Sequence, residues 1–524
     1  MSRTIFTLLN LALVVAMSRA GDLMPLGSEF VVTSRTSNVQ KQPWVACDDD
    51  GNFVLSYSQG DVYARLFDRD GNPLADDFLV NPTVNWGEQD ETYVSVDPVS
   101  GDFVIVWSDR HGNDGDQMGI GGRFYAADGT PYGSEFILNT HTAASQFEPH
   151  ASFSPSGRVF VVWTDAGTDG SAGAVGRIFT RYGTAVTGEI LINEPSTFTQ
   201  IDPSVSCDRA GNFVVAFVDA SGATGDPREV LARRFDQNGV ALGGQFLVNS
   251  ISTGMQRDPI VAVNSNGEFV VVFQDESGTD GDGWGVFARL FDASGTALGA
   301  QFVTSNTTVG DQVDPHVSVD YPGNFIVSWV DAGGVDAEVM ARRFDRFGDP
   351  LGNEFTVHAA GKLGDQSYQK FCVSQSGQRF IAVWFDNDSD DYARLFDLPM
   401  ILPDPPLTLG TTSNLDLDLP GSGSDNYILL VSLSTSPGIP VTDSRMLDLT
   451  FDTLMLYGLT VPTGPVFTNL IGVLDGSGGA TCQFIIPNNP TLSGANVSCA
   501  AVTNRTGIAR QVEQLTDSLT LTIQ

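Results

Sequence analysis

The stretch NGEFVVVFQDESGTDGDGWGVFARLFDASGTALG, residues 266–299, contains most of one copy of a repeat that runs through the greater part of the chain. Each copy has a glycine that opens a motif of the type G-N-F-V, and these glycines recur every 50 to 56 residues. Such a period is typical of propellers and other repeat arrays. Seven copies are present, anchored on Gly51, Gly101, Gly157, Gly211, Gly267, Gly323 and Gly377.

Each copy predicts four short β-strands. In the quoted copy, Phe269–Phe273 is apolar at successive positions, so both faces of this strand must be buried between two neighbouring sheets. The blades of a β-propeller meet that demand. Tight D-x-x-G turns follow the first and third strands, whereas the longer loops share the other face, where we expect any functional site.

The two ends of the repeat array complement each other. The seventh copy stops at Arg394–Asp397 without a fourth strand, while Pro25–Val32 (PLGSEFVV) reads as a fourth strand with no copy before it. A ring closed by its own first strand has no exposed sheet edge between its first and last blades. The sequence therefore predicts an all-β fold, with a seven-bladed β-propeller at 21–397 that is closed by the N-terminal strand.

The first 20 residues predict a signal peptide. Arg3 supplies a positive charge, Ile5–Met17 is apolar but too short to span a bilayer, and Ser18–Ala20 resembles a cleavage site. No later segment is long and apolar enough for a transmembrane helix. We expect a secreted or cell-surface protein with no membrane span.

The charge balance excludes one class of partner. The 524 residues carry 63 acidic and 27 basic side chains, a formal net charge of -36, and the only lysines are Lys41, Lys362 and Lys370. Nucleic acids are polyanions that require Lys and Arg for binding. We therefore expect no nucleic-acid partner.

The C-terminal part has no copy of the repeat. Residues 398–408 predict a Pro-rich linker, and 409–524 predict a small β-sandwich from short alternating strands and turn clusters. Cys482 and Cys499 lie symmetrically about a turn-rich loop, so we expect a hairpin with a disulfide between them. Cys47, Cys207 and Cys372 are expected to be buried thiols, because the spacing between neighbouring sheets is usually too wide for a bridge.

The quoted run of residues 266–299 resembles the propeller-type repeats of large secreted bacterial surface proteins and hemolysin-type calcium-binding proteins. The tail, with LLVSLSTSPGIPV and a terminal LTLTIQ, is similar to a carboxy-terminal module of uncharacterised exported bacterial proteins. The first resemblance implies a secreted repeat protein but no uniform activity, and the second implies export more than chemistry.

One set of candidate residues follows a glutamine that precedes the first strand of every copy. Five of the seven residues two positions after that glutamine are carboxylates near the expected mouth of the central channel, which suits a hard cation such as Ca²⁺. The alternative is a structural cap on the first strand, repeated because the blade is repeated. The five carboxylates are Glu91, Glu148, Asp202, Asp258 and Asp314.

A second set of candidate residues lies at the start of the first strand, at a position whose residue type differs from copy to copy. Aromatic, imidazole and ammonium groups there suit a glycan or small organic ligand, although unconstrained surface would vary in the same way. The candidate ligand-binding residues are Trp44, Tyr93, His150, His316 and Lys370.

The loops between the second and third strands are acidic and glycine-rich. Asp280 and Asp282, in the loop 275–283, are candidate Ca²⁺ ligands, and a solvated acidic surface is the alternative.

The third strand of each copy contains an arginine, such as Arg177 or Arg289. We expect these arginines to pair with the acids that follow the second strands, such as Asp165 and Asp275.

Common enzyme signatures are absent: the chain has no H-E-x-x-H, G-x-S-x-G or P-loop motif. We favour a non-catalytic secreted binding or adhesion protein that presents an acidic propeller face to a glycan, a small ligand or a surface protein. The alternatives are a polysaccharide-active enzyme, either a hydrolase or a lyase, and a structural envelope or matrix component. A pocket lined by the histidines and converging carboxylates would favour the enzyme, whereas a flat acidic face would favour binding.

Overall fold

The computed structural model describes residues 23–397 except 36–40, 84–88, 168–170, 196–197, 223–227, 360–363, 375–376, 378 and 387–389, and the backbone of the strands within 402–522. Its contacts divide the chain into two units, one formed by Met24–Leu398 and the other containing Pro399–Gln524. The described residues contain no helix that is long and apolar enough to cross a membrane.

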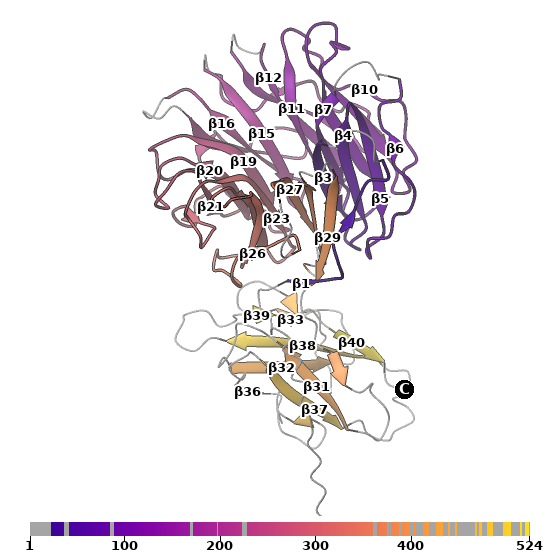
Figure 1. Cartoon of the computed structure of the whole chain (residues 1–524), viewed down its shortest axis with the longest axis vertical. Coiled ribbons are helices and arrows are strands. Elements are labelled where there is room, and N and C mark those ends of the chain that lie inside the picture. The colour runs from indigo at the N-terminus through magenta and orange to yellow at the C-terminus, as the bar shows by residue number, and fades with distance from the viewer. Residues whose placement is uncertain are drawn as a thin grey trace, which may run out of the picture. The chain divides into compact units, whose positions relative to one another are not determined.

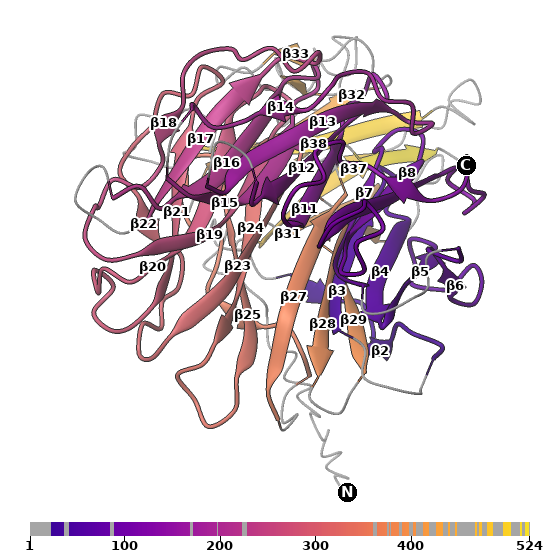
Figure 2. The ribbon, with the colours of Figure 1, turned by 90° about the horizontal axis from the view of Figure 1, so that it is seen from above.

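Residues 24–397 form seven antiparallel sheets arranged as the blades of a propeller, as the view from above shows (Figure 2). The first strand of each blade lines the central channel. These strands are β3 (Lys41–Cys47), β7 (Gln89–Val96), β11 (Gln146–Phe153), β15 (Gln200–Cys207), β19 (Gln256–Val263), β23 (Gln312–Val319) and β27 (Gln366–Val373).

The second and third strands follow outward from the channel in each sheet. The second strands are β4 (Phe53–Gln59), β8 (Phe103–Asp109), β12 (Arg158–Asp165), β16 (Phe213–Asp219), β20 (Phe269–Asp275), β24 (Phe325–Asp331) and β28 (Arg379–Asp386). The third strands are β5 (Asp61–Phe67), β9 (Gly119–Tyr125), β13 (Gly173–Thr180), β17 (Glu229–Phe235), β21 (Gly285–Phe291), β25 (Glu338–Phe344) and β29 (Asp391–Asp397).

The fourth strands are short, with two residues each. Six follow their own third strand: β6 (Phe78–Leu79), β10 (Phe136–Ile137), β14 (Ile190–Leu191), β18 (Phe246–Leu247), β22 (Phe302–Val303) and β26 (Phe355–Thr356). The predicted all-β class and seven-bladed propeller are confirmed.

The hydrophobic core lies between the blades. In β12, Val161 and Trp163 pack with the preceding blade in one buried cluster, whereas Phe160 and Val162 pack with the following blade in another. Alternating side chains of one strand thus enter two different interfaces. This explains why the second strand is apolar at every position.

The seventh blade is completed from the N-terminus, as predicted. β1 (Met24–Pro25) and β2 (Phe30–Val31) both pair antiparallel with β29, with Pro25 opposite Phe396 and Phe30 opposite Ala393 (Figure 1). The Glu29 carboxylate also accepts a hydrogen bond of 2.9 Å from the N–H of Ala359, in the loop after the sixth blade. The ring is therefore closed at its last blade by residues from the other end of the chain.

The strand arginines do not pair with the acids that we expected. Arg177 donates to the carbonyl of Leu138 at 2.9 Å, and Arg289 donates to that of Val248 at 2.7 Å, in each case in the preceding blade. The arginines of the other five third strands bind equivalent carbonyls. A guanidinium can donate several hydrogen bonds, so these residues hold the blades together through carbonyl oxygens. Arg65 also forms an ion pair of 3.7 Å with Asp77.

The C-terminal unit is also all-β. One sheet contains β30 (Leu402–Asp404), β31 (Thr412–Asp418), β37 (Gly479–Ile485) and β35 (Phe467–Thr468). A second contains β36 (Ile471–Val473), β32 (Asn426–Ser432), β38 (Asn496–Asn504), β39 (Gln514–Leu515) and β40 (Leu519–Thr522). A separate pair joins β33 (Ile439–Pro440) to β34 (Met446–Leu447).

The expected hairpin around Cys482 and Cys499 is wrong. Cys482 lies on β37, opposite Leu415 of β31, whereas Cys499 lies on β38, opposite Val431 of β32. Symmetry about a loop predicts pairing only when the two strands are partners, and here each strand joins a different sheet. The side chains of both cysteines lie outside the described residues, so the disulfide itself stays a prediction, as do the signal peptide at 1–20 and the linker at 398–408.

Candidate active site at the channel mouth

The first strand of every blade has a β-bulge near its beginning, which sets the geometry of the site. The pairing register shifts between Phe147 and His150 in the third blade, and at the same place in the other six. The residue in the bulge has left-handed backbone angles in every blade. These seven residues, here called the mouth ring, are Gln42, Glu91, Glu148, Asp202, Asp258, Asp314 and Tyr368, with φ between 51° and 56°.

Left-handed angles cost a residue other than glycine roughly 1 kcal/mol or more. The bulge persists because the glutamine that precedes it, at the start of the same strand, is fixed by hydrogen bonds. In the third blade, Asn139 Nδ2 donates to Gln146 Oε1 at 3.0 Å, while Asn139 Oδ1 accepts the N–H of Ile120 at 2.8 Å. The glutamine is therefore structural, and the bulge that it fixes carries the carboxylates.

Some mouth-ring side chains also bond to their neighbours. Glu91 Oε2 accepts the N–H of Glu148 at 2.9 Å and the hydroxyl of Ser108 at 2.5 Å. Thr164 Oγ1 donates to Glu148 Oε2 at 3.1 Å and accepts the N–H of Asp202 at 3.2 Å. Glu91 therefore serves as an acceptor for the next blade.

The five candidate ligand-binding residues meet inside the channel, directly after the bulges. The Trp44 ring lies 4.2 Å from that of Tyr93, 5.1 Å from His150 and 5.4 Å from His316, measured between ring centroids. The Lys370 ammonium lies 4.8 Å from the centre of the Trp44 ring, a cation–π contact. Trp44 therefore contacts groups from the second, third, sixth and seventh blades.

Burial keeps both imidazoles neutral at ordinary pH. It lowers the pKa of His150 to about 3, with a further contribution from the charge of Lys370, and it lowers the pKa of His316 well below its usual value. Burial also lowers the pKa of Lys370 to about 8, against the opposing effect of Asp314 and Asp258. Lys370 is thus the cation of this cluster at neutral pH.

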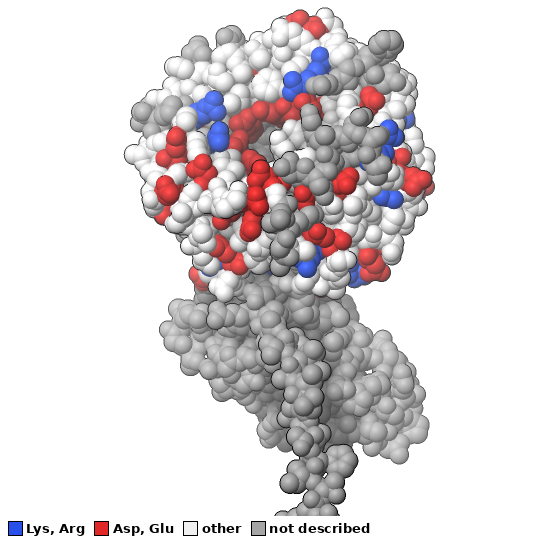
Figure 3. All heavy atoms as spheres, in the orientation of Figure 1, with Lys and Arg blue, Asp and Glu red and all other residues white. Residues whose placement is uncertain are grey.

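Two adjoining pockets lie above this aromatic cluster. One, of about 210 Å³, is lined by Glu148 and His150 of the third blade and by Asp202, Asp258 and Asp314 of the next three blades. The second, of about 190 Å³, is more apolar and is lined by Gln42, Glu91 and Tyr93 among others. Both share five residues, namely Trp44, Glu148, His150, Tyr368 and Lys370. The space-filling view shows acidic side chains gathered beside a hollow in the propeller (Figure 3).

The carboxylates of the larger pocket differ in protonation. Burial raises the pKa of Glu148 to about 10, and Asp202 adds to this through its charge and a hydrogen bond. Burial also raises the pKa of Asp258, to about 6, with the charge of Asp202 adding and that of Arg257 opposing. At neutral pH, one pocket therefore holds a protonated carboxyl group and an ionised carboxylate.

The structure thus brings together ten of the predicted residues, the five ligand candidates and the five mouth-ring carboxylates. It does not bring Asp280 and Asp282 there, since neither lines the two mouth pockets and Asp282 accepts the N–H of Gly310 at 3.3 Å in an outer loop. Among the described residues, no three His, Cys, Asp or Glu side chains form a group that could hold a metal ion. Calcium binding stays a prediction.

Sequence reasoning did not assign the polar residues that hold the carboxylates. Ser108, Thr164 and Gln274, each directly after the aromatic residue of a second strand, donate to Glu91, Glu148 and Asp258 respectively. A polar residue at the end of an otherwise apolar strand was the available signal. Tyr368 and Gln42 also line the pockets, at mouth-ring positions that carry no carboxylate.

No protein-family model matches the chain, and a search of curated proteins finds no significant match. Among solved structures, the chain is similar to the GH93 α-L-arabinofuranosidase of Fusarium graminearum, solved with arabinobiose, at 13% identity over 71% of this chain and 98% of that chain, with a TM-score of 0.44. It is also similar to the Penicillium chrysogenum α-L-arabinanase, likewise solved with arabinobiose, at 12% identity over 72% and 99% with a TM-score of 0.44. The endo-arabinase of Bacteroides thetaiotaomicron matches at 13% identity over 65% and 100%, with a TM-score of 0.34.

Our preference for a non-catalytic protein with an acidic binding face is wrong. The structure meets the condition set for the enzyme instead, because His150 and converging carboxylates line a pocket, and His316 lies directly beneath it against Trp44. The resemblance to hemolysin-type repeat proteins stays a prediction beyond the propeller itself.

Proposed function

We propose that the protein is a polysaccharide-active enzyme that hydrolyses a glycosidic bond in the pocket at the channel mouth. The observation that carries the proposal is that a protonated Glu148 and an ionised Asp258 line the same pocket. Glycoside hydrolysis needs one carboxylic acid to protonate the leaving oxygen and one carboxylate to act as base or nucleophile.

Glu148 is the general acid in this proposal. Its proton passes to the glycosidic oxygen as the bond to the anomeric carbon breaks, and the leaving sugar departs as an alcohol. Asp202, in the next blade, favours the protonated form because two carboxylates this close resist double ionisation. Thr164 donates to the other side of Glu148 and orients the carboxyl group.

Asp258 is the ionised partner. Its side chain is 43% exposed, and its Oδ2 lies 3.4 Å from Arg257 Nε and accepts a hydrogen bond from the amide of Gln274. Arg257 opposes the rise in the pKa of Asp258, and because both contacts are made to Oδ2, Oδ1 is left for water or for the anomeric carbon. Either role of Asp258, as base or as nucleophile, completes hydrolysis with water as the only co-reactant.

The surroundings suit a sugar substrate. Trp44, Tyr93 and the 42% exposed Tyr368 offer aromatic faces for the C–H face of a pyranose or furanose ring. The Lys370 ammonium and the His150 imidazole, which line both pockets, offer polar contacts for hydroxyl groups. Two adjoining pockets that share Glu148 provide room for one sugar on each side of the cleaved bond.

Extracellular polysaccharides are the expected substrates if the predicted signal peptide at 1–20 directs export. We propose this location together with the activity. Detection of the protein in the medium or on the cell surface, without its first 20 residues, tests the location independently of catalysis.

The activity is tested by incubating the purified protein with a panel of plant and microbial polysaccharides and measuring released reducing ends. Glu148→Gln and Asp258→Asn should each lower kcat by roughly 10² to 10⁴ without lowering Tm. Asp282→Asn removes an acid that lies outside the mouth pockets and is the matched control, which should retain full activity. If no polysaccharide is cleaved, or if both pocket variants keep wild-type rates, the proposal is wrong.

A further inference from the structure

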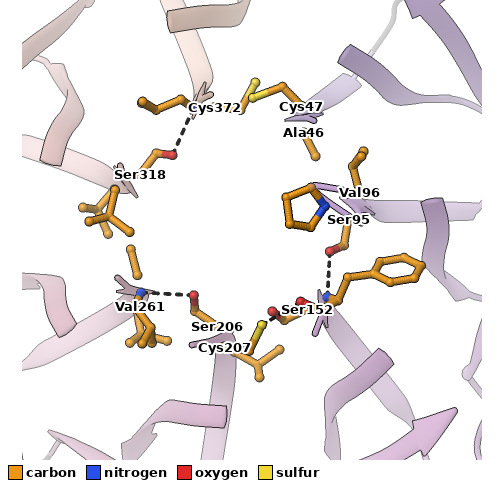
Figure 4. A pocket seen from close by; sticks show the side chains of 18 of the residues that line it. Ala46, Cys47, Ser95, Val96, Ser152, Ser206, Cys207, Val261, Ser318 and Cys372 are labelled. Atoms are coloured by element: carbon orange, nitrogen blue, oxygen red, sulfur yellow. Dashed lines mark hydrogen bonds between the residues drawn. The ribbon is translucent and has the colours of Figure 1, made fainter. Parts of the chain in front are cut away.

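Below the aromatic cluster, the channel continues into a separate cavity of about 200 Å³ in which neighbouring blades are joined by serine side chains. Ser95 Oγ accepts the N–H of Phe153 at 3.2 Å, Ser206 Oγ that of Val263 at 3.1 Å, and Ser318 Oγ that of Val373 at 3.2 Å (Figure 4). If the variable residue of each first strand, such as Tyr93, is counted as position 1, each of these serines is at position 3. Each accepts the N–H of the residue at position 4 in the next blade.

The same register pairs two cysteines where the seventh blade meets the first. Counted from Lys370, Cys372 occupies the serine position. Counted from Trp44, Cys47 occupies the position that the serine hydroxyl reaches. Figure 4 shows the two sulfur atoms side by side and turned toward each other. Both residues line the lower cavity and belong to one packed cluster.

The serine bonds show how closely the first strands of neighbouring blades approach each other at the channel. A serine side chain that bonds the next strand's N–H requires Cα atoms about 6 Å apart, which lies within the range that disulfides span. The first strands converge on the channel, so their spacing is smaller than that between the middles of two blades. Cys47, Cys207 and Cys372 are free thiols in this structure, as expected.

We propose that Cys47 and Cys372 form a redox-responsive pair that, on reaction with a small disulfide, links the first and last blades covalently. Burial and the contact with Cys47 both raise the pKa of the Cys372 thiol, which places the two groups in direct interaction. Cys47 is the more exposed of the two, so its thiolate reacts first.

The chemistry is thiol–disulfide exchange. The Cys47 thiolate attacks one sulfur of the small disulfide and displaces one thiolate, which gives a mixed disulfide. The Cys372 thiolate then attacks the Cys47 sulfur and displaces the second thiolate. The protein pair loses two electrons and two protons, and the small disulfide becomes two thiols. The narrow cavity favours a small neutral reagent, and the raised pKa of Cys372 favours mildly alkaline pH.

The bond would close the ring where closure is otherwise non-covalent. The seventh blade depends on the short strands β1 and β2 for its outer edge. A bridge between Cys47 and Cys372 would enclose nearly the whole propeller in one covalent loop, and long loops gain the most from cross-linking.

The test treats the full-length protein with 2-hydroxyethyl disulfide, alkylates the remaining thiols and maps the peptides without reduction. We expect a linked peptide containing Cys47 and Cys372, and a Tm that rises by roughly 5 °C or more over the reduced protein. Cys372→Ser reproduces the serine that four other blades carry at this position, so it should fold normally and abolish both effects. Cys207→Ser, which removes a thiol from the same cavity, should change neither.

Several outcomes would overturn the proposal. One is that both cysteines remain open to alkylation after treatment, and another is that the reagent stays attached to Cys47 without a linked peptide. A linked peptide with an unchanged Tm would show that the bond does not lock the ring.

Discussion

The indole of Trp44 and the imidazole of His316 lie edge to face, 5.4 Å apart between ring centroids, although they belong to the first and sixth blades. Trp44 lines the mouth pockets on one side and the lower cavity on the other. The aromatic cluster thus lies between the mouth pockets and the lower cavity, and a substrate that enters the mouth meets an aromatic floor.

Removal of that floor should affect both stability and substrate binding. We expect Trp44→Ala to lower the free energy of unfolding by roughly 2 kcal/mol or more, because it leaves a cavity and removes contacts with three rings and an ammonium group. KM should rise more than kcat falls, since Trp44 contacts sugar and not the reacting atoms. Urea unfolding and steady-state kinetics test this expectation. Trp44→Phe keeps part of the aromatic floor and is the control. Its free energy of unfolding and its KM should lie between those of the wild type and those of Trp44→Ala.

The pH dependence of catalysis follows from the two carboxyl groups of the pocket. Activity requires Asp258 ionised and Glu148 protonated, so kcat/KM should rise through about pH 6 and fall only near pH 10. Asp258→Glu should keep a rising limb at a shifted pH, while Asp258→Asn should remove activity at every pH. A rate that increases steadily toward acid, with no limb near pH 6, would contradict the role given to Asp258.

The same Glu148 should make the folded protein more stable in mild acid. Its pKa is raised in the folded state, so between its ordinary value and about 10 the folded protein binds more protons than the unfolded chain. The stability from Glu148 is therefore present at low pH and is lost as the pH rises. Glu148→Gln cannot lose a proton there, so the Tm of the variant relative to wild type should increase from pH 5 to pH 9.

The wild type must be compared with Glu148→Gln because the buried histidines change stability with pH in the opposite direction to Glu148. The pKa of His150 is lowered when the protein folds, so its contribution is present above the ordinary histidine pKa and is lost in acid. This term is common to both proteins and cancels in the difference. A constant Tm difference across the pH range would show that Glu148 is not held protonated.

Closure of the ring by the N-terminus is also open to test. Deletion of residues 21–33 removes β1, β2 and the Glu29 carboxylate that bonds Ala359. The edge of β29 is then exposed, and we expect a Tm lower by at least several degrees or aggregation at micromolar concentration. Glu29→Gln, which removes only the charge, should have a small effect. Unchanged melting of the deleted chain would be incompatible with the closed ring.

The repeat allowed the propeller and its closure to be predicted, because the spacing of Gly211, Gly267 and their equivalents fixes the blade length. It also predicted that Trp44, His150 and Lys370 lie together, since equal register positions in a ring converge on its axis. The protonation of Glu148 could not be predicted, because it depends on burial and on Asp202 in another blade. The tail has no repeat to fix its register, and the pairing of the strands that carry Cys482 and Cys499 was wrong for that reason.

The hydrogen bond from Ala359 to Glu29 joins residues 330 positions apart, and this separation sets the order in which the molecule can assemble. The N-terminal residues are synthesised first, yet their pairing partner β29 is made only after six blades. During synthesis, β1 and β2 therefore stay unpaired until β29 has been made, although the first six blades can complete their own sheets. The contact with the largest sequence separation is then the last to form.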